Sequence, residues 1–320
     1  MDNSPHTDWP TPCPLLVRRE PAHRLVRAQQ RGDAARISPG NYVETTQWEG
    51  LAPWQKRRVL AEGLHLNHPE IVFAGASSLE LRGLPVLNYG LAIALHRDGR
   101  PRRMRRNVVS GGQALTRYTV ETVDFAPLDD GADRIGNWRC ESLEAAAVRV
   151  VTGVETGLSA AVLVLDGAWW ALGAGPDGRA ALERAAVGLP GVAVSRFNRA
   201  MDLASPLSES AAESLARVAM WELGFQLPAA QVELLIEGRL VRPDFLWPGQ
   251  LILEVDGEGK YAGPDEAQSR RAEKQRQLAL ERAGYRVARA EWADVINPQR
   301  FRGVLARLGV PPAERQRQAG

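Results

Sequence analysis

The stretch from Arg242 to Asp256, Arg-Pro-Asp-Phe-Leu-Trp-Pro-Gly-Gln-Leu-Ile-Leu-Glu-Val-Asp, constrains the fold more than any other part of this chain. In its last residues Glu254 and Asp256 alternate with apolar residues, and this period of two predicts a strand with both carboxylates on one face. Pro248-Gly249 predicts a tight turn, which returns a strand carrying Asp244 beside the first. Carboxylates gathered in this way repel each other unless a cation lies among them, and oxygen ligands suit Mg²⁺ or Mn²⁺.

The length and composition of the chain predict a multidomain α/β protein of the cytoplasm. Its 320 residues, 44% of them hydrophobic, are enough for two or three domains with real cores. Its two cysteines, Cys13 and Cys140, lie far apart, which supports neither a disulfide framework nor a zinc knuckle and fits a reducing compartment. No run approaches the roughly 18 apolar residues of a membrane span, and no export signal is recognisable, so we expect no membrane association.

The N-terminal part has the composition of a nucleic-acid-binding region. Residues 21–31 predict a short basic helix, and residues 32–43 predict strand, turn, strand, which is the order of a winged helix's second half. The basic residues of this helix lie on roughly one face, available to phosphates or a major groove; they are Arg24, Arg27 and Arg31. The alternative is a solvated surface helix, because three arginines are common on any helix.

The most basic run of the chain lies between residues 97 and 106 and is interrupted by Gly99 and Pro101. We expect a loop here that binds nucleic acid, because counterion release from the phosphates favours contact with so dense a positive charge. The alternative is a surface loop without a ligand. The arginines concerned are Arg97, Arg100, Arg102, Arg103, Arg105 and Arg106.

Helical spacing of alanine-rich apolar residues predicts a helical middle region. The expected organisation is therefore a flexible arm at 1–14, a winged-helix-like DNA-binding region with its basic loop at 15–110, the helical middle region at 111–204, a C-terminal domain at 205–310 and a frayed tail at 311–320.

The C-terminal domain is expected to run helix, three strands, helix, strand. Its first helix begins with Ser210-Ala-Ala-Glu213, which has the spacing of a capping box and so also offers Glu213 a purely structural role. The strands are expected at 231–237, 240–246 and 251–256, followed by a helix at 266–283 closed by Gly284 and a strand at 285–290.

This order of elements, with these acids, resembles the PD-(D/E)XK nuclease core, and more closely a bacterial family related to very-short-patch-repair endonucleases. The matching segments cover roughly the last third of the chain: Ser210–Glu213, Arg242–Trp247, Leu253–Gly257, Lys260-Tyr261, Glu273–Arg276 and Ala283–Arg289. The resemblance implies a restriction-endonuclease-like αβββαβ core that hydrolyses DNA phosphodiester bonds. Residues of about 15 to 110 are similar to AbiEi-type antitoxins, whose winged-helix region is often fused to such a domain.

The resemblance also implies roles for the acids. Asp244 and Glu254 would hold a Mg²⁺ or Mn²⁺ that binds the scissile phosphate and activates a water, with Glu213 as an outer or water-mediated ligand. The family's E-x-K has become Glu254-Val-Asp256, so the lysine that would steady the attacking hydroxide is missing. Asp256 is then either a further ligand or a group that prevents the close approach of a lysine.

Two lysines are candidates for the missing charge. Lys260 follows Asp256 by four residues and would swing back across Gly257 and Gly259, unless it only neutralises its acidic neighbours in a salt bridge. Lys274 on the following helix is the second candidate, and we also expect it to contact DNA.

Two functions of different classes follow. The first is a metal-dependent DNA endonuclease or nickase, favoured by Asp244, Glu254 and Glu213, which would need a homodimer or sequential nicks to cut both strands. The second is a non-catalytic DNA-binding regulator of the AbiEi antitoxin type with a degenerate nuclease fold, favoured by the missing lysine. A toxin partner would support the regulator, and a methyltransferase partner would support restriction or repair.

Overall fold

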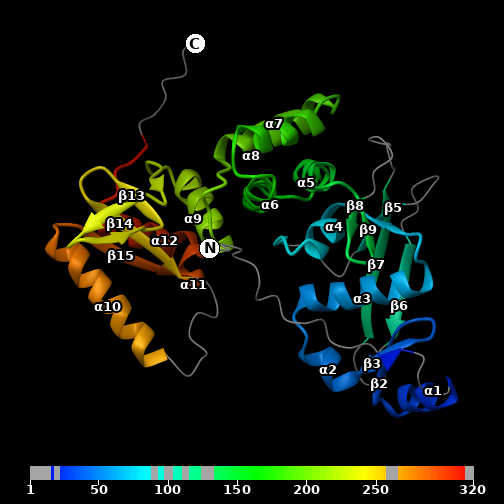
Figure 1. Cartoon of the computed structure of the whole chain (residues 1–320). Coiled ribbons are helices and arrows are strands. Elements are labelled where there is room, and N and C mark those ends of the chain that lie inside the picture. Colours follow the sequence, from blue (N-terminus) through cyan, green and yellow to red (C-terminus); the bar gives the residue numbers. More distant parts are fainter. Residues whose placement is uncertain are drawn as a thin grey trace. The chain divides into compact units, whose positions relative to one another are not determined.

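The computed structural model describes residues 16–17, 22–87, 93–96, 104–109, 115–123, 133–256 and 266–313. The chain is a mixed α/β protein, as its composition and patterning predict (Figure 1). It divides into two compact units, the first formed by residues 1–156 with 180–193, the second by 157–179 with 194–320. None of the described helices has the length and apolar surface that spanning a bilayer requires.

The first unit begins with the predicted helix and hairpin, which the structure confirms. Helix α1 (Ala22–Arg31) is followed by β2 (Ala34–Ser38) and β3 (Asn41–Glu44), which pair antiparallel, and β1 (Leu16–Val17) adds to β3. The buried Leu25 of α1 packs on Ala34 and Tyr42, so the helix lies against the hairpin.

Further helices pack on this hairpin and build the core of the first unit. Gly63 allows the close crossing, because a Cβ there would come within 2.9 Å of the Ile37 side chain. Ser38 donates a hydrogen bond of 2.7 Å to the carbonyl oxygen of Gly63, which ties hairpin to helix. The elements are α2 (Thr45–Gly50), α3 (Pro53–Asn67), β4 (Val72–Phe73) and α4 (Gly75–Leu81).

A second sheet of the first unit corrects two expectations. It has the strand order β6-β7-β5-β4-β9-β8, with β5 (Ile93–His96), β6 (Met104–Val109), β7 (Leu115–Val123), β8 (Asp133–Ile135) and β9 (Trp138–Cys140). Arg105 and Arg106 therefore lie in a strand, not a loop, and residues 115–140 contain strands instead of helices. Threonine and valine recur in β7, and such β-branched residues favour a strand, which here pairs with β6 over residues 115–120 and with β5 over residues 120–123.

Helices dominate from Leu143 onward, as expected for the middle region. They are α5 (Leu143–Thr152), α6 (Leu158–Ala171), α7 (Pro176–Ala185), α8 (Gly191–Leu203) and α9 (Ala211–Glu222). The division into compact units does not follow the expected boundary at 204, because α6 and most of α8 belong to the second compact unit. Helix α6 packs on α9, and a buried ion pair between them, described below, fixes that contact.

The sheet of the second unit has the order β10-β13-β14-β15, with β10 (Ala229–Ala230), β13 (Phe245–Trp247), β14 (Leu251–Asp256) and β15 (Arg286–Glu291). Strands β13 and β14 form the predicted hairpin, and β15 runs parallel to β14 after α10 (Glu266–Arg282). The expected strand at 240–246 is instead broken in two, since Pro243 has no N–H to donate. Its first part, β12 (Arg239–Val241), pairs with β11 (Leu234–Ile236) in a separate ribbon.

The two faces of this sheet are covered by different helices (Figure 1). On one face Ile252 packs against Leu280 of α10. The other face, which carries Phe245, Trp247 and Leu253, is buried, and α9 and α12 (Pro298–Leu308) contact the sheet. Helix α11 (Trp292–Val295) connects β15 to α12.

The first three residues of the expected frayed tail are held by backbone hydrogen bonds. Gln226 donates a backbone hydrogen bond of 2.9 Å to Pro311, and Ala313 donates one of 2.9 Å to Gly224. Residues 311–313 are thus held against the end of α9, whereas the remaining tail at 314–320 and the arm at 1–14 lie outside the described residues.

Candidate functional site

Asp244 and Glu254 lie next to each other across the β13–β14 hairpin. The antiparallel register ends with Phe245 opposite Leu253, and Asp244 and Glu254 are the next residues along the two chain segments. Asp244 also accepts a hydrogen bond of 2.7 Å on Oδ2 from the backbone N–H of Val255, which holds its carboxylate against β14.

The turn that brings these acids together has the geometry its residues favour. Gly249 has a φ of +82° and Gln250 a φ of +62°, so two successive residues adopt the left-handed conformation. Glycine adopts it without steric cost, and the predicted Pro248-Gly249 turn is confirmed. The local sequence therefore sets the register that pairs Asp244 with Glu254.

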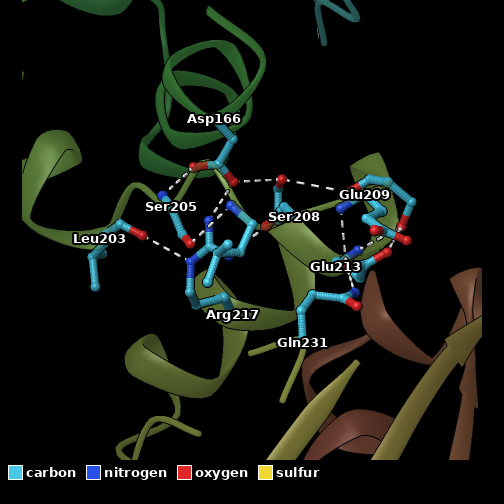
Figure 2. Close-up of polar contacts among 11 residues, drawn as sticks. Asp166, Leu203, Ser205, Ser208, Glu209, Glu213, Arg217 and Gln231 are labelled. Carbon is cyan, nitrogen blue, oxygen red and sulfur yellow. Dashed lines mark hydrogen bonds and ion pairs between the residues drawn. The ribbon is translucent and has the colours of Figure 1, made fainter. Parts of the chain in front are cut away.

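Glu213 reaches the same region from the first turn of α9. Ser210 is the N-cap of this helix: its hydroxyl accepts from the Glu213 N–H at 3.2 Å and donates to Glu213 Oε1 at 2.7 Å (Figure 2). The N–H of Glu209 donates to Glu213 Oε2 at 3.0 Å. The predicted cap is thus present, and it fixes the Glu213 carboxylate without removing it from the site.

The negative charges of Glu213 and Asp244 repel each other. The Glu213 side chain is buried, and burial, followed by the negative charge of Asp244, raises the pKa of its carboxyl above the ordinary glutamate range. Hydrogen bonds from Glu209, Ser210 and Gln231 oppose this shift and do not cancel it. Additional positive charge here would be favourable for both acids.

Gln231 connects these two acids, and sequence reasoning missed it. Its amide Nε2 donates to Glu213 Oε2 at 3.0 Å (Figure 2). Its backbone N–H donates to the Asp244 carbonyl oxygen at 3.1 Å. It has a φ of +52°, an uncommon conformation for a residue other than glycine. No local pattern in the sequence marks Gln231, because its contacts come from residues distant in the chain.

Two arginines meet the remaining acids, and sequence reasoning gave neither a role. Arg276 of α10 forms an ion pair with Glu254. Arg289 of β15 is the register partner of Glu254, and its Nη1 lies 3.7 Å from Asp256 Oδ2. Arg276 and Glu254 are 22 residues apart in the sequence, which explains why spacing alone did not reveal the pair.

The structure describes only one of the two lysines expected to supply this charge. Lys274 is exposed on α10, two residues before Arg276, and is not among the described partners of Glu254. Lys260 lies outside the described residues. The positive charge described beside Glu254 is therefore a guanidinium.

A buried network supports the helix start that carries Glu213. Asp166 of α6, which is 2% exposed, accepts hydrogen bonds from the Ser205 N–H at 2.7 Å and the Ser214 hydroxyl at 2.6 Å, and it forms an ion pair with Arg217 (Figure 2). Burial raises the pKa of Asp166 against the opposing pull of Arg217.

Arg217 extends this network to the chain that leads into α9. It donates to the Leu203 carbonyl oxygen at 2.8 Å and to the Ser208 hydroxyl at 2.5 Å (Figure 2). The segment between α8 and α9 is thereby tied to both helices, immediately before Ser210. Asp166 and Arg217 thus position the N-terminus of α9 and, with it, Glu213.

The residues expected to contact DNA in the first unit are placed only in part. Arg24, Arg27 and Arg31 are exposed on α1, and Arg31 Nε lies 2.8 Å from Asp33 Oδ2 in an ion pair open to solvent. Arg105 and Arg106 lie on β6, and Arg100, Arg102 and Arg103 fall outside the described residues.

Comparisons of the chain with protein-family models, with curated proteins and with solved structures found no match. Among the side chains that the structure describes, no three histidine, cysteine, aspartate or glutamate residues are grouped as metal ligands are. Mg²⁺, however, commonly binds through one or two carboxylates and completes its octahedron with water and substrate phosphate oxygens. The facing pair Asp244 and Glu254 fits that donor set.

Proposed function

We propose that this protein is a divalent-metal-dependent DNA nickase or endonuclease, with Asp244 and Glu254 as the ligands of Mg²⁺ or Mn²⁺. The observation that carries the proposal is the β13–β14 hairpin, in which Asp244 and Glu254 follow the paired residues Phe245 and Leu253 and the Asp244 carboxylate is held by the Val255 N–H. The pKa of Glu213 is raised by burial and by the negative charge of Asp244. This electrostatic effect is further support, because it indicates that Glu213 contributes negative charge close to Asp244. The order α9, β13, β14, α10, β15 supports the restriction-endonuclease-like core that the sequence motifs suggest.

In this proposal Asp244, Glu254 and Glu213 have different roles in phosphodiester hydrolysis. When bound, the cation would polarise the scissile phosphate and lower the pKa of an attacking water. Asp244, held by the Val255 N–H, and Glu254 fix its position. Glu213, anchored by Ser210 and Gln231, orients a water at the edge of the site.

Arg276 takes the part of the missing lysine in this proposal. Its ion pair with Glu254 keeps a guanidinium beside the proposed ligands, where it can stabilise the negative charge that develops on phosphorus oxygens. Lys260 stays a prediction, as do the DNA contacts of Lys274 and of the N-terminal arginines. Asp256, which lies near Arg289, serves to hold that arginine.

The alternative proposal is a non-catalytic DNA-binding regulator. It is favoured by the same Asp256, because an acid stands where the family carries its lysine and meets an arginine there. The exposed arginines of α1 would then make the principal DNA contacts.

A nicking assay separates the two proposals. The full-length protein is incubated with supercoiled plasmid in Mg²⁺, in Mn²⁺ and in EDTA, and the relaxed and linear products are quantified. The nuclease proposal expects conversion with either metal and none in EDTA. DNA binding without conversion, across plasmids of different sequence and methylation, would instead support the regulator.

Arg276→Ala is expected to slow nicking by about 10²-fold, as the loss of one donor to a developing negative charge typically does. Arg276→Lys should retain more of the rate, because it keeps the charge and loses the planar fork. Single-turnover rates at saturating Mg²⁺ measure the effect, with the exposed Lys274→Ala on the same helix as the control. Equal rates for wild type and Arg276→Ala would remove Arg276 from the mechanism.

The acid side of the pH–rate profile should report on Glu213. Because the pKa of Glu213 is raised by burial and by Asp244, this carboxyl takes up its proton at a higher pH than an ordinary glutamate as the pH falls. Protonation removes negative charge that favours the cation, so activity is lost early on the acid side. Glu213→Gln should move this acid limb to lower pH, whereas the exposed Glu222→Gln on the same helix should not. Superimposable limbs for Glu213→Gln and wild type would contradict the role.

A further inference from the structure

A pocket of about 320 Å³ opens between β15 and α12 in the second unit. Three arginines line it: Arg286 and Arg289 from β15, and Arg307 from the last turn of α12. Its remaining wall includes the buried Val304 and Leu308. The pocket thus joins an apolar wall to three arginine residues.

The position of Arg286 is set by the end of α12. Its Nη2 donates a hydrogen bond of 2.9 Å to the carbonyl oxygen of Arg307, which satisfies one of the last acceptors of the helix. Gly309 follows with a φ of +90°, and a Cβ at that position would lie 3.0 Å from Arg286 Nη1. The glycine therefore leaves room for the guanidinium, and the guanidinium offsets the negative end of the helix dipole that would otherwise repel an anion.

The charge of the pocket is only partly balanced. Arg289 Nη1 lies 3.7 Å from Asp256 Oδ2. Within the described part of the chain, neither Arg286 nor Arg307 forms an ion pair with a carboxylate. Like charges gathered in this way favour an anionic ligand, and guanidinium groups match the oxygens of a phosphate with paired donors.

The pocket is next to the proposed catalytic acids. Arg289 is the register partner of Glu254 on the neighbouring strand, and adjacent strands lie about 4.8 Å apart. Arg289 therefore belongs to the pocket and to the surroundings of Glu254 and Asp256 at once.

We propose that the pocket formed by Arg286, Arg289 and Arg307 binds an internal DNA phosphate adjacent to the scissile one. This inference rests on the proposed nuclease function for its ligand. It makes the pocket a positioning site: the backbone is gripped on one side of the bond to be cut. Such a contact carries no base specificity and contributes affinity that depends on salt.

The test measures DNA binding, so it does not depend on cleavage. Fluorescence anisotropy with a labelled duplex is recorded in Ca²⁺ over a range of salt concentrations for wild type, Arg286→Ala, Arg307→Ala and the double variant. Each single change should weaken binding about tenfold, as expected for a hydrogen-bonded charge, and the double variant should lower the salt slope by about one. Arg302→Ala, an exposed arginine on the same helix, is the control.

Two further measurements test which phosphate is bound and whether the variants are folded. Duplexes with and without a 5′-phosphate are compared: an equal loss on both supports an internal phosphate, and a loss confined to the phosphorylated duplex overturns it. Thermal melting of each variant verifies that the fold is intact, which matters because Arg286 also caps α12. Affinities and salt slopes equal to wild type in folded variants would overturn the pocket, whether or not the protein cleaves DNA. If the variants bind duplex DNA more weakly and the wild type does not nick DNA, the phosphate-binding role of the pocket is supported and the nuclease function is refuted.

Discussion

The Asp244→Asn variant should nick plasmid DNA about 10³ times more slowly than the wild type at saturating Mg²⁺. Metal ions contribute several kcal/mol of charge stabilisation to phosphoryl transfer, and about 4 kcal/mol corresponds to this factor. Asparagine removes the anionic charge that faces Glu254 across the hairpin. It still presents an oxygen that can accept from the Val255 N–H, as Asp244 does at 2.7 Å, so the fold should be preserved.

Two comparisons make this result interpretable. Glu233→Gln, which neutralises an exposed acid between β10 and β11, should leave the rate unchanged. The circular dichroism spectrum of Asp244→Asn should match the wild type, and its melting temperature should be slightly higher, because removing the charge of Asp244 relieves its repulsion with Glu213. A folded Asp244→Asn variant that nicks at the wild-type rate would exclude Asp244 as a metal ligand.

Asp166→Ala is expected to lower the free energy of unfolding by about 3–5 kcal/mol, the usual cost of removing one partner from a buried ion pair. The change leaves Arg217, 6% exposed, without its carboxylate, and it deprives the Ser205 N–H and the Ser214 hydroxyl of their acceptor. Urea unfolding followed by tryptophan fluorescence measures the loss. The loss should fall on the unfolding transition of the second unit, which contains both residues.

A double variant separates the ion pair from the surrounding packing. Asp166→Leu with Arg217→Met leaves no buried charge, so it should be more stable than either single variant, since apolar replacements of buried pairs are often tolerated. Losses that simply add would show that the pair contributes little coupling. This network fixes the start of α9, so a change to Asp166 or Arg217 should also displace Glu213. The folded protein of either single variant should therefore show a shifted acid side of its pH–rate profile.

Local patterns in the sequence predicted the elements that carry the site. Alternation placed β14 at 251–256 with Glu254 and Asp256 on one face, and Pro248-Gly249 placed the turn, because each depends on residues adjacent in the chain. The N-cap Ser210 and helix α10 were predicted for the same reason. The facing of Asp244 and Glu254 follows from these local features together.

The rest depends on contacts between distant residues. Arg276 meets Glu254 across 22 residues and Gln231 meets Glu213 across 18, and no periodicity encodes either pair. Asp166 of α6 contacts Arg217 of α9 across 51 residues, and α6 therefore belongs to the same compact unit as α9. No local pattern near residue 204 predicts this contact. The strands β7 to β9 were missed since alanine-rich helices that follow them dominated the pattern of residues 111–204.

Binding of Mn²⁺, followed by electron paramagnetic resonance of the free ion, tests most directly whether Asp244 and Glu254 hold a divalent cation. The wild type should show saturable binding that Mg²⁺ competes away, and both Asp244→Asn and Glu254→Gln should lose it, whereas Glu233→Gln should bind as the wild type does. Wild-type affinity for Mn²⁺ in the folded Asp244→Asn and Glu254→Gln variants would contradict the account.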